Sequence, residues 1–185
     1  MYIQTTINGR RIYDNSSTYF LTMTVTNWID VFTRARYCDI IVDSLNFCHK
    51  NKGLVIHAWV IMSNHLHLIV QSENENLSDI IRDFKKHTSK EIIKSIKADE
   101  ESRREWLLWM FERAAKKEGR KGFKLWQDGN HAEELISNKF FGQKLDYIHQ
   151  NPVKARIVYA ANEYIWSSAV DYCDGKGLVE IEKLE

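Results

Sequence analysis

Cysteine, proline and glycine are scarce in this chain. Its 185 residues include three cysteines, one proline and eight glycines. Because Cys38, Cys48 and Cys173 are odd in number and form no CxxC pair, a disulfide framework and a zinc-thiolate site are both disfavoured. The chain must rely on a hydrophobic core, for which 44% hydrophobic residues suffice. We expect a single domain over residues 1–185, with its core at about 18–172.

Long apolar runs and a large net charge are also missing. No stretch approaches the roughly 18 apolar residues that cross a bilayer, and the beginning, MYIQTTINGRRIYDNSS, does not have the layout of a signal peptide. We therefore expect a cytoplasmic protein without a membrane partner. The net charge of +1 does not indicate a nucleic-acid partner. Only RAAKKEGRKGFK, at 113–124, is strongly basic, and such a run is more often a solvated helix end than a phosphate-binding surface.

The first half of the chain shows the periodicities of three strands and one helix. TYFLTMTVTN, at 18–27, alternates apolar residues with threonines and predicts a strand. Apolar residues at helical spacing predict a helix at 35–51 that ends before Gly53. Two further strands are predicted at 54–61 and 65–71. Only three residues separate them, which favours an antiparallel hairpin.

The second half shows mainly helical spacing. NLSDIIRDFKKHTSKEIIKSI, at 76–96, predicts a helix capped at Asn76 or Ser78. SRREWLLWMFERAAKK predicts another, and FKLWQ is a short strand candidate. A last helix, in SNKFFGQKLDYIHQN, should stop near Pro152, because a proline disfavours helical geometry in the residue before it. The helix in SRREWLLWMFERAAKK is expected to bury Trp106, Leu107, Met110 and Phe111. An α+β fold is the simplest interpretation.

Two histidines interrupt the apolar segment VIMSNHLHLIV, at 60–70. Side chains two residues apart on a strand share a face, so His65 and His67 should point at one place, while Leu66 and Leu68 point into the core. The pair could bind a metal. Each ring could equally be held by backbone partners or face solvent, and the spacing alone does not decide between these possibilities.

A second group of polar residues lies in LDYIHQNPVKA, at 145–155. Tyr147 and Asn151 are four residues apart and share a helix face, while Leu145 and Ile148 belong to the buried stripe. An amide oxygen could complete a divalent-metal site begun by two imidazoles, and the phenol would then lie within reach of what the metal binds. Packing for the tyrosine and a cap for the asparagine are equally compatible with this spacing. His149 should point away from this face and have a structural role.

Three separated motifs, MSNHLHLIV, LDYIHQNPVKA and EYIWSSAVDY, resemble in sequence and order the REP-associated tyrosine transposases. These belong to the HUH single-strand DNA transposases, which are IS200-like and use one tyrosine. The resemblance also includes YFLTMTVTN, SDIIRDFKKHTSKEI and KLWQDGNHAEEL, and so covers most of residues 18–172. It implies a ferredoxin-like antiparallel sheet of four or five strands. Helices would pack on one face, and the tyrosine helix would lie across the HxH strand.

The same resemblance implies an activity. His65, His67 and Asn151 would bind Mg²⁺ or Mn²⁺, and Tyr147 would attack a DNA phosphodiester, leaving a 5′-phosphotyrosine and a free 3′-OH. The strand could then be rejoined without ATP. The substrate would be single-stranded DNA, often a hairpin of a repeated palindromic element. A monomer with its tyrosine in cis is favoured over a homodimer. One departure is Arg156, where related sequences have glycine, and it predicts a remodelled turn after the tyrosine helix.

Binding of single-stranded DNA requires cations for phosphates and aromatic rings for unpaired bases. The Trp126 ring could stack on a base, although core packing beside Phe123 and Leu125 is favoured. The candidate cations are Arg82, Lys85, Lys86 and Lys90 on the exposed face of the 76–96 helix, and Lys116, Lys117, Arg120, Lys121 and Lys124 in the basic run. Two other functions remain open. One is a metal-dependent phosphodiesterase that uses activated water, and the other is a domesticated, non-catalytic DNA-binding protein.

Overall fold

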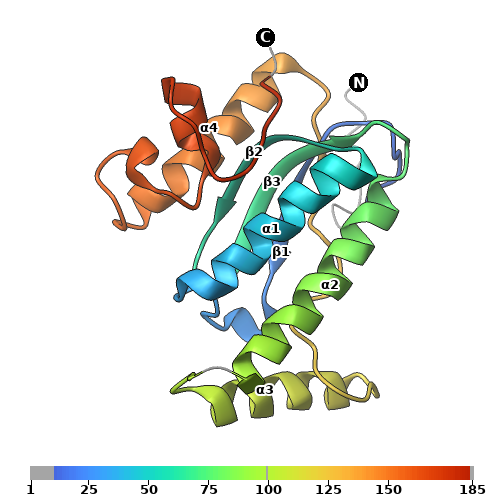
Figure 1. Cartoon of the computed structure of the whole chain (residues 1–185). Helices are drawn as coiled ribbons and strands as arrows, with labels where there is room; N and C mark the ends of the chain where they lie inside the picture. The colour runs from blue at the N-terminus through green and yellow to red at the C-terminus, as the bar shows by residue number, and fades with distance from the viewer. Residues whose placement is uncertain (1–10, 99, 184–185) are drawn as a thin grey trace, which may run out of the picture.

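The computed structural model describes residues 11–98 and 100–183. Its strands form one antiparallel sheet in the order β2-β3-β1-β4 (Figure 1). The elements are β1 (Tyr19–Thr24), the 3-10 helix η1 (Thr26–Trp28), α1 (Ala35–Lys52), β2 (Leu54–Ile61), β3 (His65–Ser72), α2 (Leu77–Ala98), α3 (Arg104–Lys117), β4 (Glu133–Glu134), α4 (Asn138–Lys154), and the 3-10 helices η2 (Ala161–Glu163) and η3 (Ser168–Cys173).

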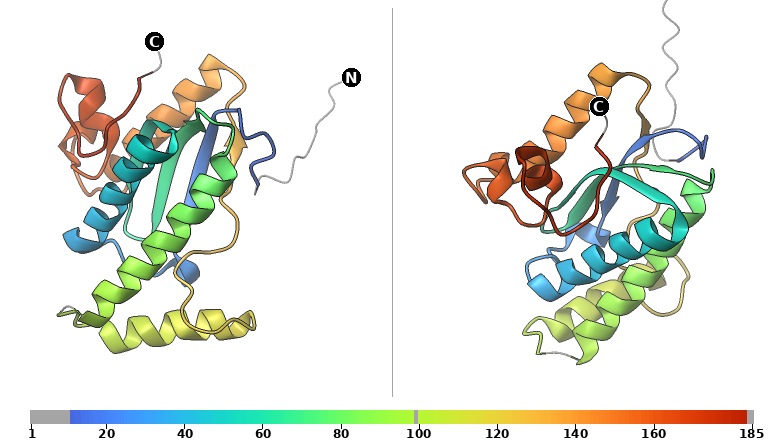
Figure 2. Two further views of the ribbon diagram at one scale, coloured as in Figure 1. Left: turned by 45° about the vertical axis from the view of Figure 1, so that its right-hand side comes forward. Right: turned by 45° about the horizontal axis from the view of Figure 1, so that its top comes forward.

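This arrangement confirms the expected ferredoxin-like α+β fold. The helices α1 and α2 cover one face of the sheet, and α3 packs against α2 (Figure 1). The opposite face carries α4, which packs on β2 and β3 (Figure 2). None of the helices in the described ranges is both long and apolar enough to cross a membrane.

The interior strand β3 is buried on both of its faces. Leu66 and Leu68 belong to the large core cluster beneath α1 and α2, and both are fully buried. Ile69 points the other way and packs with Ile148 of α4 in a smaller cluster. The alternation predicted for this strand is therefore confirmed. The hairpin with β2 is closed by the Met62 N–H, which donates to the His65 carbonyl at 2.8 Å.

The free edge of β2 is covered by the C-terminal part of the chain. The Ile61 N–H donates to the Trp166 carbonyl at 2.9 Å, and the Glu182 N–H donates to the Ile56 carbonyl at 2.8 Å. Val60 also forms an isolated bridge with Ser167. Every residue of β2 is buried as a result.

Two expectations about the second half of the chain are wrong. FKLWQ does not form a strand, because only Trp126 pairs with the end of β1, through an isolated bridge to Val25. In α3, Leu107 and Phe111 are buried, but Trp106 is 48% exposed and Met110 is only partly buried. Since α3 packs mainly on α2, it buries a single narrow stripe.

The helix α4 ends at Lys154, near Pro152 as expected, although Pro152 itself lies within the last turn of the helix. A proline in the last turn removes only one intrahelical hydrogen bond, and the end is closed by a Schellman motif. In that motif the Ile157 N–H donates to the Pro152 carbonyl and the Arg156 N–H to the Val153 carbonyl, each at 2.9 Å.

Arg156 adopts the left-handed conformation of this motif, with φ of 59°. Glycine favours this position because it has no Cβ to clash there. The turn is therefore not remodelled by the arginine, which keeps the backbone conformation that a glycine would have.

We predict that Arg156→Gly raises the free energy of unfolding by about 1 kcal/mol, because it removes the Cβ that strains the left-handed backbone at this position. Glycine also makes the unfolded chain more flexible, which offsets a small part of this gain. Urea denaturation measures the change. Arg156→Ala is the matched control, since it removes the same side chain and keeps the strained Cβ. An equal gain in both variants would show that the side chain, and not the backbone, is responsible.

Candidate active site between the sheet and α4

Four rings meet where α4 crosses the sheet: His65 and His67 from β3, Phe20 from β1 and Tyr147 from α4. The centroid of the His67 ring lies 4.7 Å from that of His65 and 5.2 Å from that of Tyr147. Phe20 stacks on His67 at 5.2 Å. The structure therefore brings the histidine pair and the tyrosine, which are far apart in the sequence, to one place.

The His65 ring is oriented by the residue before it. Asn64 Oδ1 lies 2.8 Å from His65 Nδ1. The amide nitrogen of Asn64 donates to Asp30 Oδ1 at 2.9 Å and to the Trp28 carbonyl at 3.3 Å, which fixes the amide with its oxygen toward the histidine. An amide oxygen only accepts, so Nδ1 of His65 carries the proton and Nε2 keeps its lone pair.

The His67 ring is held from β1. Its Nδ1 lies 2.9 Å from the hydroxyl of Thr22, which is its cross-strand partner in the sheet. Its Nε2 is buried and has no hydrogen-bond partner within the described residues. A buried nitrogen in this position is able to accept a bond from a ligand such as a metal ion or a water molecule. With Nδ1 occupied, Nε2 is the atom that a metal would take.

Both histidines are neutral near pH 7. Burial lowers the pKa of His67 to about 3, with smaller contributions from the neighbouring His65 and Lys144. Burial also lowers the pKa of His65. A neutral imidazole is the form that binds metals. The described ranges contain no group of three or more His, Cys, Asp or Glu side chains that could hold a metal.

Asn151 lies one turn after Tyr147 and is partly buried. Its amide nitrogen lies 3.4 Å from the Tyr147 carbonyl. His149 points elsewhere, as expected, because its Nε2 lies 3.0 Å from the hydroxyl of the buried Ser168. That hydroxyl also accepts from the Trp59 N–H of β2 at 3.0 Å, so His149 ties α4 to the sheet.

Two lysines of α4 flank the tyrosine. Lys144 Nζ lies 4.3 Å from the centroid of the Phe20 ring, and it pairs with Glu133 at 2.8 Å. Lys154 Nζ lies 5.9 Å from the centroid of the Tyr147 ring. Tyr147 itself is 42% exposed. The site therefore combines two neutral imidazoles, an accessible phenol and two cations, which suits a phosphate-containing substrate.

The family model "Transposase IS200 like" matches residues 15–113, which are 99 of the 185 residues and include both histidines. The chain belongs to the IS200-like transposase family. No similar sequence was found among proteins of curated function.

The fold of this IS200-like transposase is also that of a solved relative. A REP-associated tyrosine transposase, whose structure was solved bound to a REP hairpin, superposes with a TM-score of 0.62. The match covers 95% of this chain and 92% of that chain at 19% sequence identity. It therefore includes α4, which lies outside the region that the family model matches.

Three residues proposed to contact DNA have roles inside the fold. Lys85 is not on an exposed face: its ammonium donates to the Gln127 and Gly129 carbonyls, and burial lowers its pKa to about 8. Lys124 is 9% exposed and pairs with Glu118 and Asp128. Trp126 belongs to the hydrophobic core, which is the role that the sequence favoured, and its indole N–H donates to the Thr88 hydroxyl at 3.0 Å.

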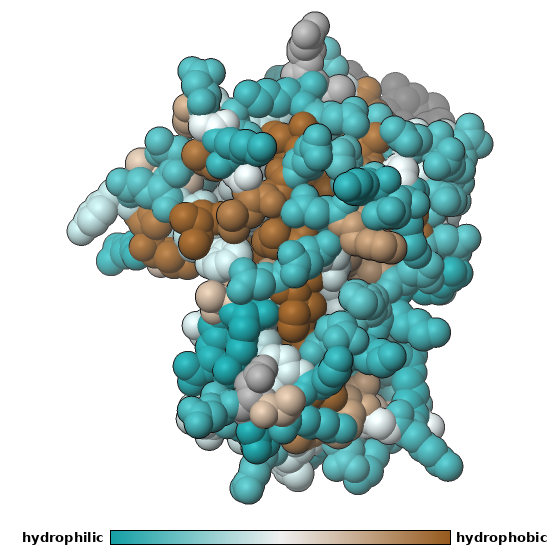
Figure 3. All heavy atoms as spheres, viewed as in Figure 1, coloured by the Kyte–Doolittle hydropathy of each residue, from teal (hydrophilic) through white to brown (hydrophobic). Residues whose placement is uncertain are grey.

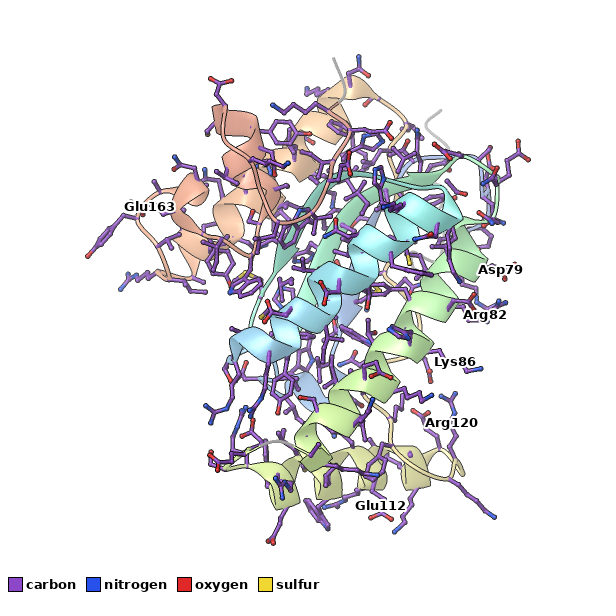
Figure 4. All side chains as sticks on the ribbon, viewed as in Figure 1. Asp79, Arg82, Lys86, Glu112, Arg120 and Glu163 are labelled. Atoms are coloured by element: carbon purple, nitrogen blue, oxygen red, sulfur yellow. The ribbon has the colours of Figure 1, made fainter. Side chains whose placement is uncertain are left out.

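The remaining candidates are exposed. Arg82 and Lys86 project from α2 into solvent, with Arg82 beside Asp79 (Figure 4). Lys86 and Lys90 line a groove of about 930 Å³ between α1 and α2. That face carries apolar residues bordered by hydrophilic ones (Figure 3), and it lies across the sheet from the histidines. Lys121, after α3, is also exposed. Lys116, Lys117 and Arg120 are exposed as well, with Lys116 paired to Glu112 and Arg120 to Asp128. DNA contacts by these seven cations stay predictions.

Sequence reasoning missed the groups that hold the site together. Lys144 could have been found, because it lies three residues before Tyr147 and so shares its helix face. Thr22 could have been found too, as a polar residue alternating on a strand that pairs with the histidine strand. No sequence signal identifies Asp30 and Trp28, which reach Asn64 through a loop whose path depends on the tertiary fold.

We predict that His65 carries its proton on Nδ1 near neutral pH. Long-range ¹H–¹⁵N NMR spectra distinguish the two tautomers. In Asn64→Leu the acceptor is lost, and the population should shift toward the Nε2–H form. Asn46→Leu, which removes a side-chain amide on α1, should leave the His65 signals unchanged. An Nε2–H form in the unmodified protein would contradict this arrangement.

Proposed function

We propose that this transposase cleaves and rejoins single-stranded DNA through a 5′-phosphotyrosine at Tyr147, with Mg²⁺ or Mn²⁺ held by His65 and His67. The observation that carries the proposal is the contact between the Tyr147 ring and His67, whose Nε2 is buried without a partner among the described residues. A metal ligand and a nucleophile are thus adjacent within one chain.

The donor atoms present fit such a cation. Nε2 of both imidazoles and the amide oxygen of Asn151 would hold it, and a substrate phosphate would supply further oxygen ligands. When bound, Mg²⁺ or Mn²⁺ supplies Lewis-acid stabilisation of charge on the phosphoryl oxygens. Thr22 and Asn64 would keep the two rings in place, since partners on Nδ1 orient a metal-binding histidine.

The chemistry of the strand exchange follows from Tyr147. Its phenol oxygen would form a bond to the phosphorus while the bond from phosphorus to the 3′ oxygen breaks. The phenol proton is lost, and the departing 3′ oxygen gains one to become a free hydroxyl. Reversal of these steps reseals the strand. Lys144 and Lys154 would stabilise the added negative charge from either side of the tyrosine.

We propose that the substrate carries a hairpin, as in the solved relative, and that this chain is of the REP-associated kind. Arg82, Lys86, Lys90 and Lys121 would contact phosphates of the DNA away from the cleavage position. A monomer suffices for this activity, because Tyr147 reaches the histidines of its own chain.

We predict that Tyr147→Phe abolishes a covalent protein-DNA adduct and lowers cleavage at least about 1,000-fold, because the nucleophile is lost. The assay incubates labelled single-stranded DNA from the flanks of the gene with the protein and Mn²⁺, followed by denaturing electrophoresis. Tyr159→Phe is the matched control, since Tyr159 is 99% exposed.

The same assay separates the alternatives. Cleavage by Tyr147→Phe at the unmodified rate, without an adduct, would identify a phosphodiesterase that uses water. Hairpin binding that survives loss of His65 and His67, with no cleavage by the unmodified protein, would identify a non-catalytic DNA-binding protein.

We predict that a mixture of Tyr147→Phe with the double variant His65→Ala/His67→Ala is inactive. Each molecule lacks one half of the site, and the halves belong to the same chain. Adduct formation in the mixture, compared with each variant alone, provides the measurement. Recovered activity would show that the tyrosine acts in trans within a dimer.

A further inference from the structure

We propose that Trp28 is the stacking platform for an unpaired base next to the scissile phosphate, and so helps to select single-stranded DNA. The proposal rests on the function proposed above. Trp28 is 60% exposed, although tryptophan is among the side chains that most favour burial. Its ring centroid lies 6.2 Å from that of His65, and the rings meet at 72° rather than stacking on each other.

The backbone presents this indole to solvent at a conformational cost. Asn27 and Trp28 both adopt left-handed conformations, with φ of 54° and 55°. Such conformations are disfavoured for residues with a Cβ and persist only where neighbouring contacts hold them. Here the Trp28 N–H donates to the Val25 carbonyl at 3.0 Å, and the Val25 N–H donates to the Asn64 carbonyl at 2.8 Å.

The same contacts tie Trp28 to the histidine pair. Asn64, which orients the His65 ring, also donates from its amide nitrogen to the Trp28 carbonyl at 3.3 Å. The loop is anchored further along, where the guanidinium of Arg103 donates to the Asp30 carbonyl at 2.7 Å. The backbone that carries the indole is therefore held in place relative to a metal-ligand candidate.

An exposed aromatic ring beside a phosphate site is suited to one kind of ligand. Every base has a π face, so an aromatic ring can stack on an unpaired base irrespective of sequence. A base in a duplex is already stacked between its neighbours and cannot use such a ring without being unstacked. Trp28 would thus favour an unpaired strand over a duplex at the cleavage position.

Trp109 offers a matched comparison within the chain. It is 51% exposed on α3 and packs under the guanidinium of Arg113, 5.1 Å from the ring centroid. Trp109 has the same indole side chain as Trp28 and a similar exposed fraction, but its ring is not among those that contact His65 and His67. If exposed tryptophans bound DNA in general, loss of either residue would weaken DNA binding. If the stacking position is at Trp28, only loss of Trp28 should weaken it.

The test measures binding apart from chemistry. Tyr147→Phe protein is titrated into a series of single-stranded oligonucleotides that carry the fluorescent base 2-aminopurine at each position in turn. Stacking on an indole quenches this base, so we expect quenching at a position adjacent to the cleavage site. Trp28→Ala should abolish the quenching and weaken binding about 5- to 150-fold, Trp28→Phe should restore most of the affinity, and Trp109→Ala should change neither.

A purely structural role is excluded by a separate readout. Because Trp28 contacts Asn64 through its backbone, Trp28→Ala should leave His65 in the Nδ1–H tautomer, although loss of the nearby indole ring shifts the His65 signals. With Tyr147 intact, the variant should raise KM for single-stranded DNA more than it lowers kcat. Unchanged quenching and affinity in Trp28→Ala would overturn the proposal, even if adducts form normally. Absence of adducts in the unmodified protein would refute the proposed chemistry but leave the quenching result interpretable.

Discussion

The site depends on one constraint, which is the register between β1 and β3. In this register Thr22 lies opposite His67, and Thr24 lies opposite His65. A shift by one residue would turn every side chain of one strand to the other face. It would place apolar side chains beside the histidines and send the threonine hydroxyls into the core beneath α1 and α2. Because both faces of β3 are buried, this shift would cost stability as well as function, so the fold itself keeps the two imidazoles in place.

The two faces of the sheet bury very different numbers of apolar side chains. The face under α1 and α2 contains the large core cluster, which includes most of the fully buried side chains. The face under α4 has a small cluster of six buried residues, among them Phe20 and Ile148. A helix held by so few apolar contacts gains from the polar tie between His149 and Ser168. Stability thus comes mainly from one side of the sheet, which leaves the other side free to expose Tyr147 beside the histidines.

Local periodicity was enough to predict much of this fold. The alternation around His65 and His67, the hairpin before them and the common face of Tyr147 and Asn151 all depend on neighbours within one element. Lys85 is not exposed as predicted, because periodicity says which face a side chain lies on, but not whether a distant loop covers that face. The basic run likewise does not reveal that Lys124 pairs with Glu118 and Asp128. The end of α4 near Pro152 was also predicted, but the hydrogen bonds from Arg156 and Ile157 that close the helix were not. The approach of Asp30 to Asn64, and the left-handed backbone at Trp28, arise only when the loop after β1 meets the hairpin.

The C-terminal segment along β2 has a further consequence for the behaviour of the chain in solution. An uncovered strand at the edge of a sheet offers its N–H and C=O groups to any extended chain nearby, which leads to aggregation. Here Trp166, Ser167 and Glu182 occupy that edge. The strand next to the histidine strand is thereby covered by a later segment of the same chain, so the hairpin that carries the histidine pair is protected from pairing with foreign strands. The EYIWSSAVDY motif, which supplies Trp166 and Ser167, thus helps to cover the edge of the sheet.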